Sequence, residues 1–270
     1  MNINPFDLTG RVIVITGGTG LLGLAHARAV HAARGIPILL DIASPGREEL
    51  DRRAGFEVEC LLCDITKQDQ VQSALARTLE RFGRIDVLIN NAANNPKVEN
   101  ADLLRNSRLE NYPLERWDAD IAVGLTGAMI CSRVFGAEMA RRGRGVIVNI
   151  ASDLALIAPD QRLYAVDDLP TEAQPVKPVS YSVVKSGLIG LTRYLATYWA
   201  DRGVRANALC PGGVENGQDV VFLRRIAERI PLGRMAHLDE YAGAVLFLCS
   251  DASSYMTGAL LAVDGGRSAW

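Results

Sequence analysis

Tyr181 and Lys185 stand four residues apart in the sequence YSVVK, a spacing that places two side chains on the same face of a helix. A phenol has a pKa of about 10 and is a poor acid or base at neutral pH. A neighbouring ammonium group stabilises the phenolate and makes proton transfer by the tyrosine accessible. Ser152 closes the apolar run GVIVNIAS, and its hydroxyl is suited to orienting a substrate carbonyl. These three side chains predict acid–base chemistry on a carbonyl or an alcohol.

The sequence TGGTGLLG, residues 16–23, follows a run of branched apolar residues and precedes an alanine-rich helical stretch. This order of strand, glycine turn and helix is the context of a dinucleotide-binding site. Glycines let the backbone approach a pyrophosphate, and the N–H groups of the helix N-terminus face it. The turn therefore predicts a phosphate cradle, with a plain tight turn as the alternative.

Two acidic residues, Asp41 and Asp64, end the next apolar runs, IPILLD and LLCD. Asp41 is suited to accepting hydrogen bonds from the adenosine ribose, and its charge would repel a 2′-phosphate, so NAD is predicted in preference to NADP. A turn former before SPG is the alternative for Asp41. Asp64 is suited to bonding the adenine or, equally, to capping the helix that follows.

Seven apolar runs separated by amphipathic helical stretches predict the elements that position these residues. Near-continuous apolar strands are covered on both faces, which predicts an α/β fold of the Rossmann type: a doubly wound, mostly parallel seven-stranded sheet flanked by helices. No linker or repeat divides the chain, so 1–270 is predicted to be one domain. The expected strands are 11–16, 36–41, 57–62, 85–90, 145–151, 205–209 and 260–264.

The segment 156–180 interrupts this alternation with four prolines and no clear period. A long structureless loop inside a compact domain is usually functional or disordered. Its position between Ser152 and Tyr181 predicts one wall of a substrate pocket, with a surface loop as the alternative. The polar side chains expected to offer hydrogen bonds there are Asp160, Arg162, Tyr164, Asp167, Asp168 and Glu172.

The composition argues against several classes of partner. A net charge of −2 provides no basic field for nucleic acid or anionic lipid. No uninterrupted apolar run has membrane-spanning length, and the N-terminus lacks an export signal. Five cysteines, an odd number, favour reduced thiols and a cytoplasmic location. The lone pair Cys60 and Cys63 lacks further ligands at metal-binding spacing, so no metal is expected.

Over essentially its whole length the chain resembles the short-chain dehydrogenase/reductase family, through TGGTGLLG, NNAA, NIAS, YSVVK, RANALCPGGV and TGALLAVDGG. The resemblance implies that Tyr181 is the general acid or base and that Ser152 positions the reacting oxygen. It implies that Lys185 lowers the pKa of the tyrosine and holds the nicotinamide ribose, and that Val214 bonds the carboxamide. The implied cofactor contacts are Gly17, Thr19, Gly20, Leu22, Gly23, Asp41, Ile42, Asp64, Ile65, Asn91, Ala92, Tyr181, Lys185, Pro211 and Val214.

Three features depart from the single-domain branch of that family. The glycines follow TGxxGxxG, the spacing of the longer branch that acts on nucleotide sugars, with Leu21 where the single-domain branch has glycine. Ser152 and Tyr181 are 29 residues apart, and the extra segment resembles the approach to YxxxK in nucleotide-sugar epimerases. Gly124 stands where the family has a catalytic asparagine, which puts the proton relay to solvent in doubt.

A narrower resemblance concerns the substrate. The stretches KPVSYSVVKSGLIGLTRYLATYWA, PLGRMAHLDEY and FLCSDASSYMTG are similar to oxidoreductases of bacterial pathways that decorate flagellin with sialic-acid-like sugars. We therefore expect NAD(H)-dependent interconversion of a secondary alcohol and a ketone on a sugar, sugar phosphate or polar polyol. A general short-chain alcohol dehydrogenase or ketoreductase on another small molecule is one alternative, and a non-catalytic NAD-binding module is another.

Two helical stretches, 114–141 and 180–202, carry apolar residues on more than one side. In the resembling family the equivalent helices pack against another subunit. The sequence therefore predicts a homodimer or homotetramer, with the contact built on Ile121, Leu125, Leu188, Leu195 and Trp199.

Overall fold

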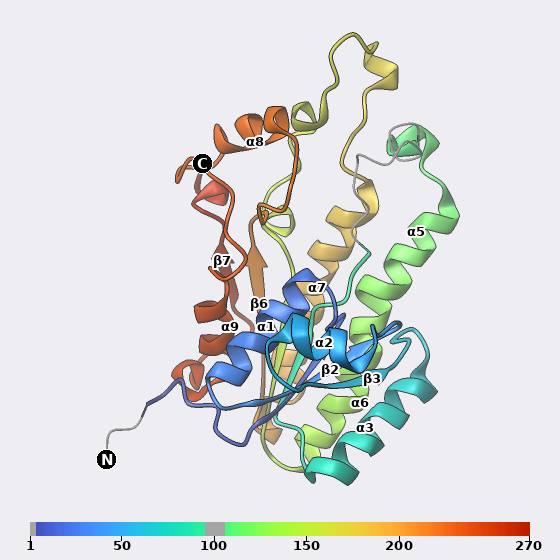
Figure 1. Ribbon diagram of the computed structural model, residues 1–270. Helices are drawn as coiled ribbons and strands as arrows, with labels where there is room; N and C mark the ends of the chain where they lie inside the picture. The colour runs from blue at the N-terminus through green and yellow to red at the C-terminus, as the bar shows by residue number, and fades with distance from the viewer. Residues whose placement is uncertain (1–3, 95–105) are drawn as a thin grey trace.

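The computed structural model describes residues 4–94 and 106–270 and contains one sheet of seven parallel strands in the order β3-β2-β1-β4-β5-β6-β7 (Figure 1). The predicted fold class is confirmed, and each predicted strand appears within two residues of its expected ends. The strands are β1 (Val12–Thr16), β2 (Ile36–Asp41), β3 (Glu59–Leu62), β4 (Val87–Asn90), β5 (Gly145–Ile150), β6 (Val204–Pro211) and β7 (Leu260–Val263). The helices are α1 (Leu21–Ala32), α2 (Arg47–Ala54), α3 (Gln68–Phe82), α5 (Leu114–Ile121), α6 (Ala128–Arg141), α7 (Val179–Tyr198), α8 (Val220–Ala227) and α9 (Ala242–Cys249).

Helices cover both faces of the sheet, and alternate residues of each strand serve the two sides (Figure 1). In β1, Val14 packs into the core beneath α3, α6 and α7, together with Phe135. The next residue, Ile15, packs into the opposite core with Leu24 of α1 and Val245 of α9. This double coverage explains why the strands read as continuous apolar runs.

The carboxyl ends of the strands meet at one edge of the sheet. The strand order reverses at β1, which is paired with β2 on one side and β4 on the other. Open parallel sheets bind ligands in the crevice at such a switch point. Gly17 follows β1, Asn91 follows β4 and Ser152 follows β5 closely, so the fold brings all three to this edge.

The helices α5 and α6 form one continuous helix, joined by a π-helical segment, Ala122–Gly127. Contrary to the sequence expectation, this helix is long and apolar enough by length and composition to cross a membrane. Half of its most apolar window is buried, and Phe135 and Met139 are fully enclosed in the core. Packing against the sheet therefore accounts for its apolar character.

The segment 156–180 is ordered by short turns, so the expectation of a structureless loop is wrong. It contains the 3₁₀ turns Gln161–Tyr164 and Thr171–Ala173, and α7 already begins at Val179. The side chain of Gln174 donates to the carbonyl oxygens of Val166 and Leu169 at 2.9 and 2.6 Å and accepts from the N–H of Val166 at 2.8 Å. These local hydrogen bonds order the segment, although its sequence has no apolar periodicity. The segment rises beside α8 and returns to α7 (Figure 1).

His26 on α1 is 1% exposed, and neither ring nitrogen has a hydrogen-bond partner among the described residues. Burial lowers its pKa from the ordinary value of 6.5 to about 4. The ring is therefore neutral in the folded protein over a range in which the unfolded chain takes up a proton. Acidification from pH 7.5 to pH 5 should thus lower the free energy of unfolding through this group by about 2 kcal/mol.

Chemical denaturation of wild type and His26→Leu at both pH values measures this effect. The variant should lose about 2 kcal/mol less than wild type on acidification. His31→Gln is the matched control, since His31 is exposed on the same helix. An equal pH dependence in wild type and His26→Leu would contradict the prediction.

Candidate active site

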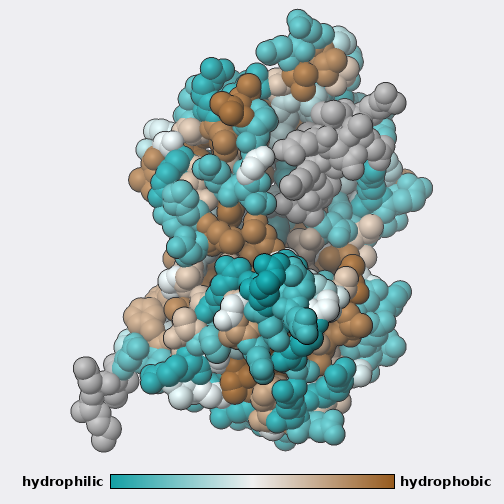
Figure 2. Space-filling view, viewed as in Figure 1, coloured by the Kyte–Doolittle hydropathy of each residue, from teal (hydrophilic) through white to brown (hydrophobic). Residues whose placement is uncertain are grey.

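A cavity of about 940 Å³ opens at the carboxyl edge of the sheet. Figure 2 shows hydrophobic surface gathered at the waist of the molecule, between the largely hydrophilic lower half and the upper projections. The cavity brings together Ser152 and every cofactor-contact residue expected from the sequence. Its lining includes Gly17, Thr19, Gly20, Leu22, Gly23, Asp41, Ile42, Asp64, Ile65, Asn91, Ala92, Ser152, Tyr181, Lys185, Pro211 and Val214.

The glycine turn after β1 has no space for side chains at Gly17, Gly18 and Gly23. Gly17 has a φ of 61°, and a Cβ there would lie 2.9 Å from the Cα of Ala92. A Cβ on Gly23 would lie 2.3 Å from the carbonyl oxygen of Gly17. Helix α1 starts at Leu21 directly above this turn. The close packing leaves backbone N–H groups at the helix N-terminus facing the cavity, an arrangement suited to a phosphate.

The end of β4 is tied to this glycine turn. The side chain of Asn91 donates to the carbonyl oxygens of Thr16 and Gly17 at 2.9 and 3.1 Å. The hydroxyl oxygen of Thr16 accepts from the backbone N–H groups of Asn91 and Ala92, both at 3.0 Å. The two strand ends that flank the switch point are therefore held in a fixed relation.

Asp41 borders the cavity at the end of β2. Its Oδ2 accepts from the N–H of Thr19 at 3.0 Å and from the Thr19 hydroxyl at 2.8 Å. Its contact with the N–H of Ala43, which a turn-forming role requires, is much longer, at 3.5 Å. Arg53 donates to the carbonyl oxygen of Thr19 at 2.8 Å, so a cation also lies close by. The Asp41 carboxylate is thus held more closely by the glycine turn than by the turn that follows β2.

Asp64 borders the cavity and also shapes its own turn. Its Oδ1 accepts from the N–H and the hydroxyl of Thr66 at 2.9 and 2.7 Å. These hydrogen bonds hold the pKa of Asp64 below its usual value, the Thr66 hydroxyl contributing most. The local turn is therefore formed, while α3 itself begins later, at Gln68.

The candidate catalytic side chains converge from β5 and α7. Ser152 is 4% exposed, and its hydroxyl donates to Oδ1 of Asp153 at 2.8 Å. The ammonium group of Lys185 donates to the carbonyl oxygen of Ile150 at 2.7 Å and lies 5.8 Å from the centre of the Tyr181 ring. The helical spacing of four thus places the lysine beside the tyrosine, as the sequence predicts.

Burial has the largest effect on the electrostatics of Tyr181. Burial raises the pKa of Tyr181 above its ordinary value, and the hydrogen bond with Ser152 acts in the opposite direction. Burial also lowers the pKa of Lys185 to about 8, an effect reinforced by the nearby charge of Lys177. The expected lowering of the tyrosine pKa by Lys185 stays a prediction, and this charge would act against the rise that burial causes.

Lys177 is a lining residue that sequence reasoning missed. Its ammonium group lies 4.0 Å from the centre of the Tyr181 ring, closer than Lys185. Burial lowers the pKa of Lys177 to about 8, and the charges of Asp153 and Asp120 act in the opposite direction. Lys177 precedes α7, so helical spacing gave no signal for it. Tyr181 therefore has two ammonium groups near its ring.

Gly124 lies in the π-helical segment, opposite the catalytic helix. A Cβ at this position would lie 2.5 Å from Cγ1 of Val184. The space that an asparagine side chain would need is therefore filled by a residue of the YSVVK stretch itself. Irregular π-helical turns inside α-helices frequently occur at functional sites, and here the segment contributes Val123 to the cavity lining.

The segment 156–180 contributes part of the cavity wall. Of its six polar side chains singled out from the sequence, Tyr164 and Asp167 line the cavity. Asp160 instead pairs with Arg162 at 2.8 Å and with Arg229 at 2.5 Å, which fastens the segment near the end of α8. The remaining lining residues from this segment are Leu163, Ala165, Val166, Pro175 and Lys177.

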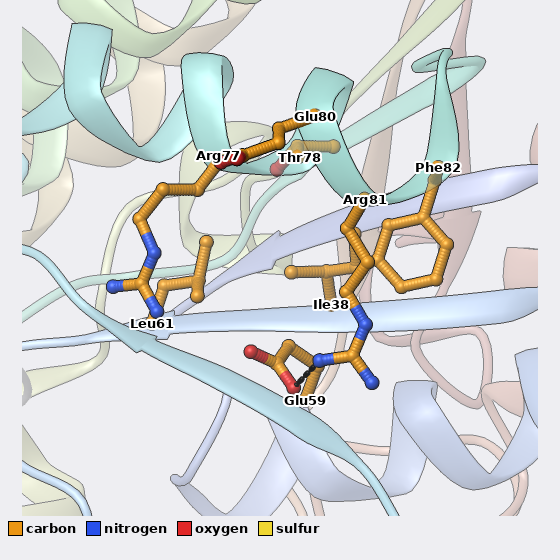
Figure 3. A pocket seen from close by; sticks show the side chains of 8 residues that line it. All are labelled: Ile38, Glu59, Leu61, Arg77, Thr78, Glu80, Arg81 and Phe82. Atoms are coloured by element: carbon orange, nitrogen blue, oxygen red, sulfur yellow. Dashed lines mark hydrogen bonds and ion pairs between the residues drawn. The ribbon is translucent and has the colours of Figure 1, made fainter.

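A second, smaller pocket of about 190 Å³ lies between β3 and the C-terminal half of α3 (Figure 3). Arg81 and Glu59 form an ion pair across it. None of the candidate site residues lines this pocket. Within residues 4–94 and 106–270, no group of three or more His, Cys, Asp and Glu side chains is arranged to hold a metal ion.

Known proteins are similar to this chain in sequence and in fold. The family model described as short chain dehydrogenase matches residues 11–165, and one described as Enoyl-(Acyl carrier protein) reductase matches residues 171–268. D-threitol dehydrogenase of Mycolicibacterium smegmatis is 33% identical over 270 residues, which cover 97% of this chain and 94% of that protein.

Solved structures agree with this assignment. An NAD⁺-bound xylitol dehydrogenase has 25% identity and a TM-score of 0.81, with 96% of this chain and 99% of that chain covered. A gluconate 5-dehydrogenase from Burkholderia cenocepacia, in complex with NADP and tartrate, has 29% identity and a TM-score of 0.81, with 99% and 98% covered. The chain belongs to the short-chain dehydrogenase/reductase family and is an oxidoreductase enzyme.

Proposed function

We propose that this enzyme uses NAD(H) to interconvert a secondary alcohol and a ketone on a polar polyol or sugar-like substrate in the cytoplasm. The observation that carries the proposal is the single cavity shared by the glycine turn, Asp41 and the group Ser152, Tyr181 and Lys185. In this proposal residues 1–270 form one cofactor-binding domain, and 156–180 is its substrate-side insertion.

The residues present fit a nicotinamide dinucleotide. The glycine turn offers backbone N–H groups to the pyrophosphate, and Asp41 offers a carboxylate to the adenosine ribose. Asp64 and Ile65 border the adenine end, while Pro211 and Val214 border the nicotinamide end, beside Lys185. When bound, the cofactor accepts or gives the hydride.

The acid–base work falls to Tyr181. In alcohol oxidation its oxygen removes the hydroxyl proton of the substrate, and in ketone reduction its hydroxyl returns that proton. Ser152 holds the reacting oxygen beside it, because its one proton, which Asp153 accepts in the absence of substrate, turns to that oxygen when substrate binds. Lys185 and Lys177 place positive charge near the tyrosine, and the charge of an oxidised nicotinamide adds to theirs. These charges oppose the rise in pKa that burial causes.

The proton released in oxidation needs a path that does not use residue 124. Val184 fills the space in which an asparagine would act. Polar groups near Tyr181 include those of Ser152, Lys177 and Lys185. We propose that proton exchange with solvent runs on the open side of the cavity.

The substrate class is supported by the relatives and by the cavity wall. The similar proteins include enzymes named for threitol, xylitol and gluconate. Apolar and polar side chains alternate around the substrate end of the cavity, which suits a small ligand with several hydroxyl groups. These lining residues include Leu163, Tyr164, Asp167, Lys177, Gln218, Asp219, Val221, Phe222, Arg225 and Met235.

Absorbance of NADH, followed on purified enzyme with a panel of polyols, sugar acids, sugar phosphates, nucleotide sugars and simple secondary alcohols, tests this proposal. Oxidation of polyols or sugar derivatives with NAD is the expected result. Turnover of simple alcohols alone would favour a general alcohol dehydrogenase. Tight NAD binding without turnover of any compound would favour a non-catalytic module and contradict the proposal.

Shortening the insertion between positions 164 and 175 to a brief Gly-Ser link should raise KM at least tenfold or abolish turnover, because Tyr164 and Asp167 leave the wall. NAD affinity should stay unchanged, since the glycine turn is distant. Asp167→Asn and Asp168→Asn form a matched pair of point variants, because Asp167 lines the cavity and Asp168 does not. Unaltered kinetics in the shortened enzyme would return the segment to a purely structural role.

We also propose a homodimer or homotetramer, although the contact differs from the one expected. Leu188 and Leu195 are buried within the chain's own core and are unavailable to a partner. Tyr194 and Tyr198, stacked at 5.4 Å on the outer face of α7, are 61% and 57% exposed. Light scattering should give a dimer or tetramer at micromolar concentration, and Tyr198→Glu should shift it toward monomer. A wild-type monomer would contradict this prediction.

A further inference from the structure

Asp153 follows Ser152 directly and is 3% exposed. Its Oδ1 accepts from the hydroxyl of Ser152 and from the N–H of Leu154, both at 2.8 Å. Its Oδ2 accepts from Nη1 of Arg267 at 2.7 Å. Both oxygens of this buried carboxylate thus have partners, and one of these partners is the candidate catalytic serine.

Arg267 reaches this carboxylate from the far end of the chain, 114 residues away in sequence. It opens the short 3₁₀ turn Arg267–Ala269, its side chain is 10% exposed, and it lines the cavity. The backbone before it is fixed by Asp264, whose carboxylate accepts from the N–H groups of Gly266 and Ser268 at 3.0 and 2.8 Å. The guanidinium group is therefore presented to Asp153 from a defined turn.

We infer that Arg267 is a positioning residue that acts through Asp153 to hold the oxygen of Ser152 in one rotamer, from which the serine proton turns from Asp153 to the reacting oxygen when substrate binds. The inference rests on the proposed function, in which Ser152 holds the reacting oxygen. An unrestrained serine hydroxyl samples three staggered positions. A carboxylate that is itself clamped by a guanidinium selects one of them, because hydrogen bonds to ionised groups are shorter and stronger than neutral ones.

A purely structural role for the ion pair is the alternative, and the chain offers a matched control for it. Arg84 and Asp86 form another ion pair, at 2.6 Å, in which the carboxylate is 9% exposed. Asp86 also accepts from the backbone N–H of Val12 at 2.9 Å. This pair precedes β4, at the opposite edge of the sheet from the cavity. Loss of either arginine leaves a buried carboxylate unpaired, but only one of the two carboxylates contacts Ser152.

Steady-state kinetics of Arg267→Met, Arg267→Lys and Arg84→Met separate the two roles. Arg267→Met should lower kcat roughly 100-fold with the Kd for NAD unchanged, because small misplacements of catalytic groups have effects of this size. Arg267→Lys should recover part of the loss by restoring the charge. Arg84→Met should keep kcat even if its Tm falls as far. Equal kcat in Arg267→Met and Arg84→Met would overturn the inference.

Two further measurements test the route through Ser152. In a Ser152→Ala background, Arg267→Met should cost almost no additional activity, whereas a full further loss would contradict the route. Crystal structures of Arg267→Met, or of Arg267→Lys if the former does not fold, should show the Ser152 hydroxyl in more than one rotamer. A single, unchanged Ser152 rotamer in the variant structures would overturn the inference, and this result can be obtained without a known substrate. Absence of turnover in the wild-type enzyme would instead count against the proposed function alone.

Discussion

Tyr181→Phe should lower kcat roughly a thousandfold or more while NAD still binds. The substitution removes the oxygen that exchanges a proton with the substrate in the proposed mechanism. It keeps the ring, from whose centre the ammonium groups of Lys177 and Lys185 lie 4.0 and 5.8 Å away. Steady-state turnover with saturating NAD and direct titration of NAD give the two quantities separately.

The matched control is Tyr164→Phe. Tyr164 also lines the cavity, and burial raises the pKa of its hydroxyl to about 12, so this group is a poor acid or base at neutral pH. Its loss should alter KM more than kcat. Near-full activity of Tyr181→Phe, or an equal loss of kcat in both variants, would show that the mechanism is wrong.

Asp41→Asn should reduce the preference for NAD over NADP by roughly 100-fold, equivalent to about 3 kcal/mol of charge repulsion at a partly exposed site. The asparagine keeps the shape that contacts Thr19 at 2.8 Å but loses the charge that repels a 2′-phosphate. Arg53, which already contacts the carbonyl oxygen of Thr19, would then be the cation nearest the glycine turn for that phosphate to meet.

Titration of both cofactors against wild type and variant measures the change. Asp64→Asn removes an acidic side chain from the same end of the cavity, where the carboxylate is held by Thr66 and does not face the glycine turn. It should leave the discrimination unchanged. Equal affinity of the wild-type enzyme for NAD and NADP would contradict the proposal that Asp41 selects NAD.

The fold was predictable because parallel strands that are buried on both faces appear in the sequence as near-continuous apolar runs. The run that forms β2 is bounded correctly at both ends, since Asp41 marks the point at which the strand leaves the core. The errors occur where side chains, and not periodicity, set the structure. Hydrogen bonds from Gln174 order an insertion whose sequence has no hydrophobic periodicity. Helices α5 and α6 together are apolar enough to cross a membrane, and half of their most apolar window is buried in the core.

Residues of the candidate site were found where motif and backbone coincide, as at Gly17, where any side chain would strike Ala92. Lys177 and Arg267 were missed because each enters the cavity from irregular backbone, before α7 and after β7. The rise in the Tyr181 pKa that burial causes had no signal in the sequence, because loss of solvation depends on tertiary packing. The spacing of residues in the sequence shows which groups come close together, but not how far burial removes them from water.

Deuterium transfer tests the central claim most directly. A polyol substrate that carries deuterium on the carbinol carbon is oxidised with NAD, and the reduced cofactor is analysed by mass spectrometry and NMR. The account predicts one deuterium at C4 of the nicotinamide, on a single face, and no label with Tyr181→Phe. Reduced cofactor without deuterium, or turnover that needs no NAD, would contradict it.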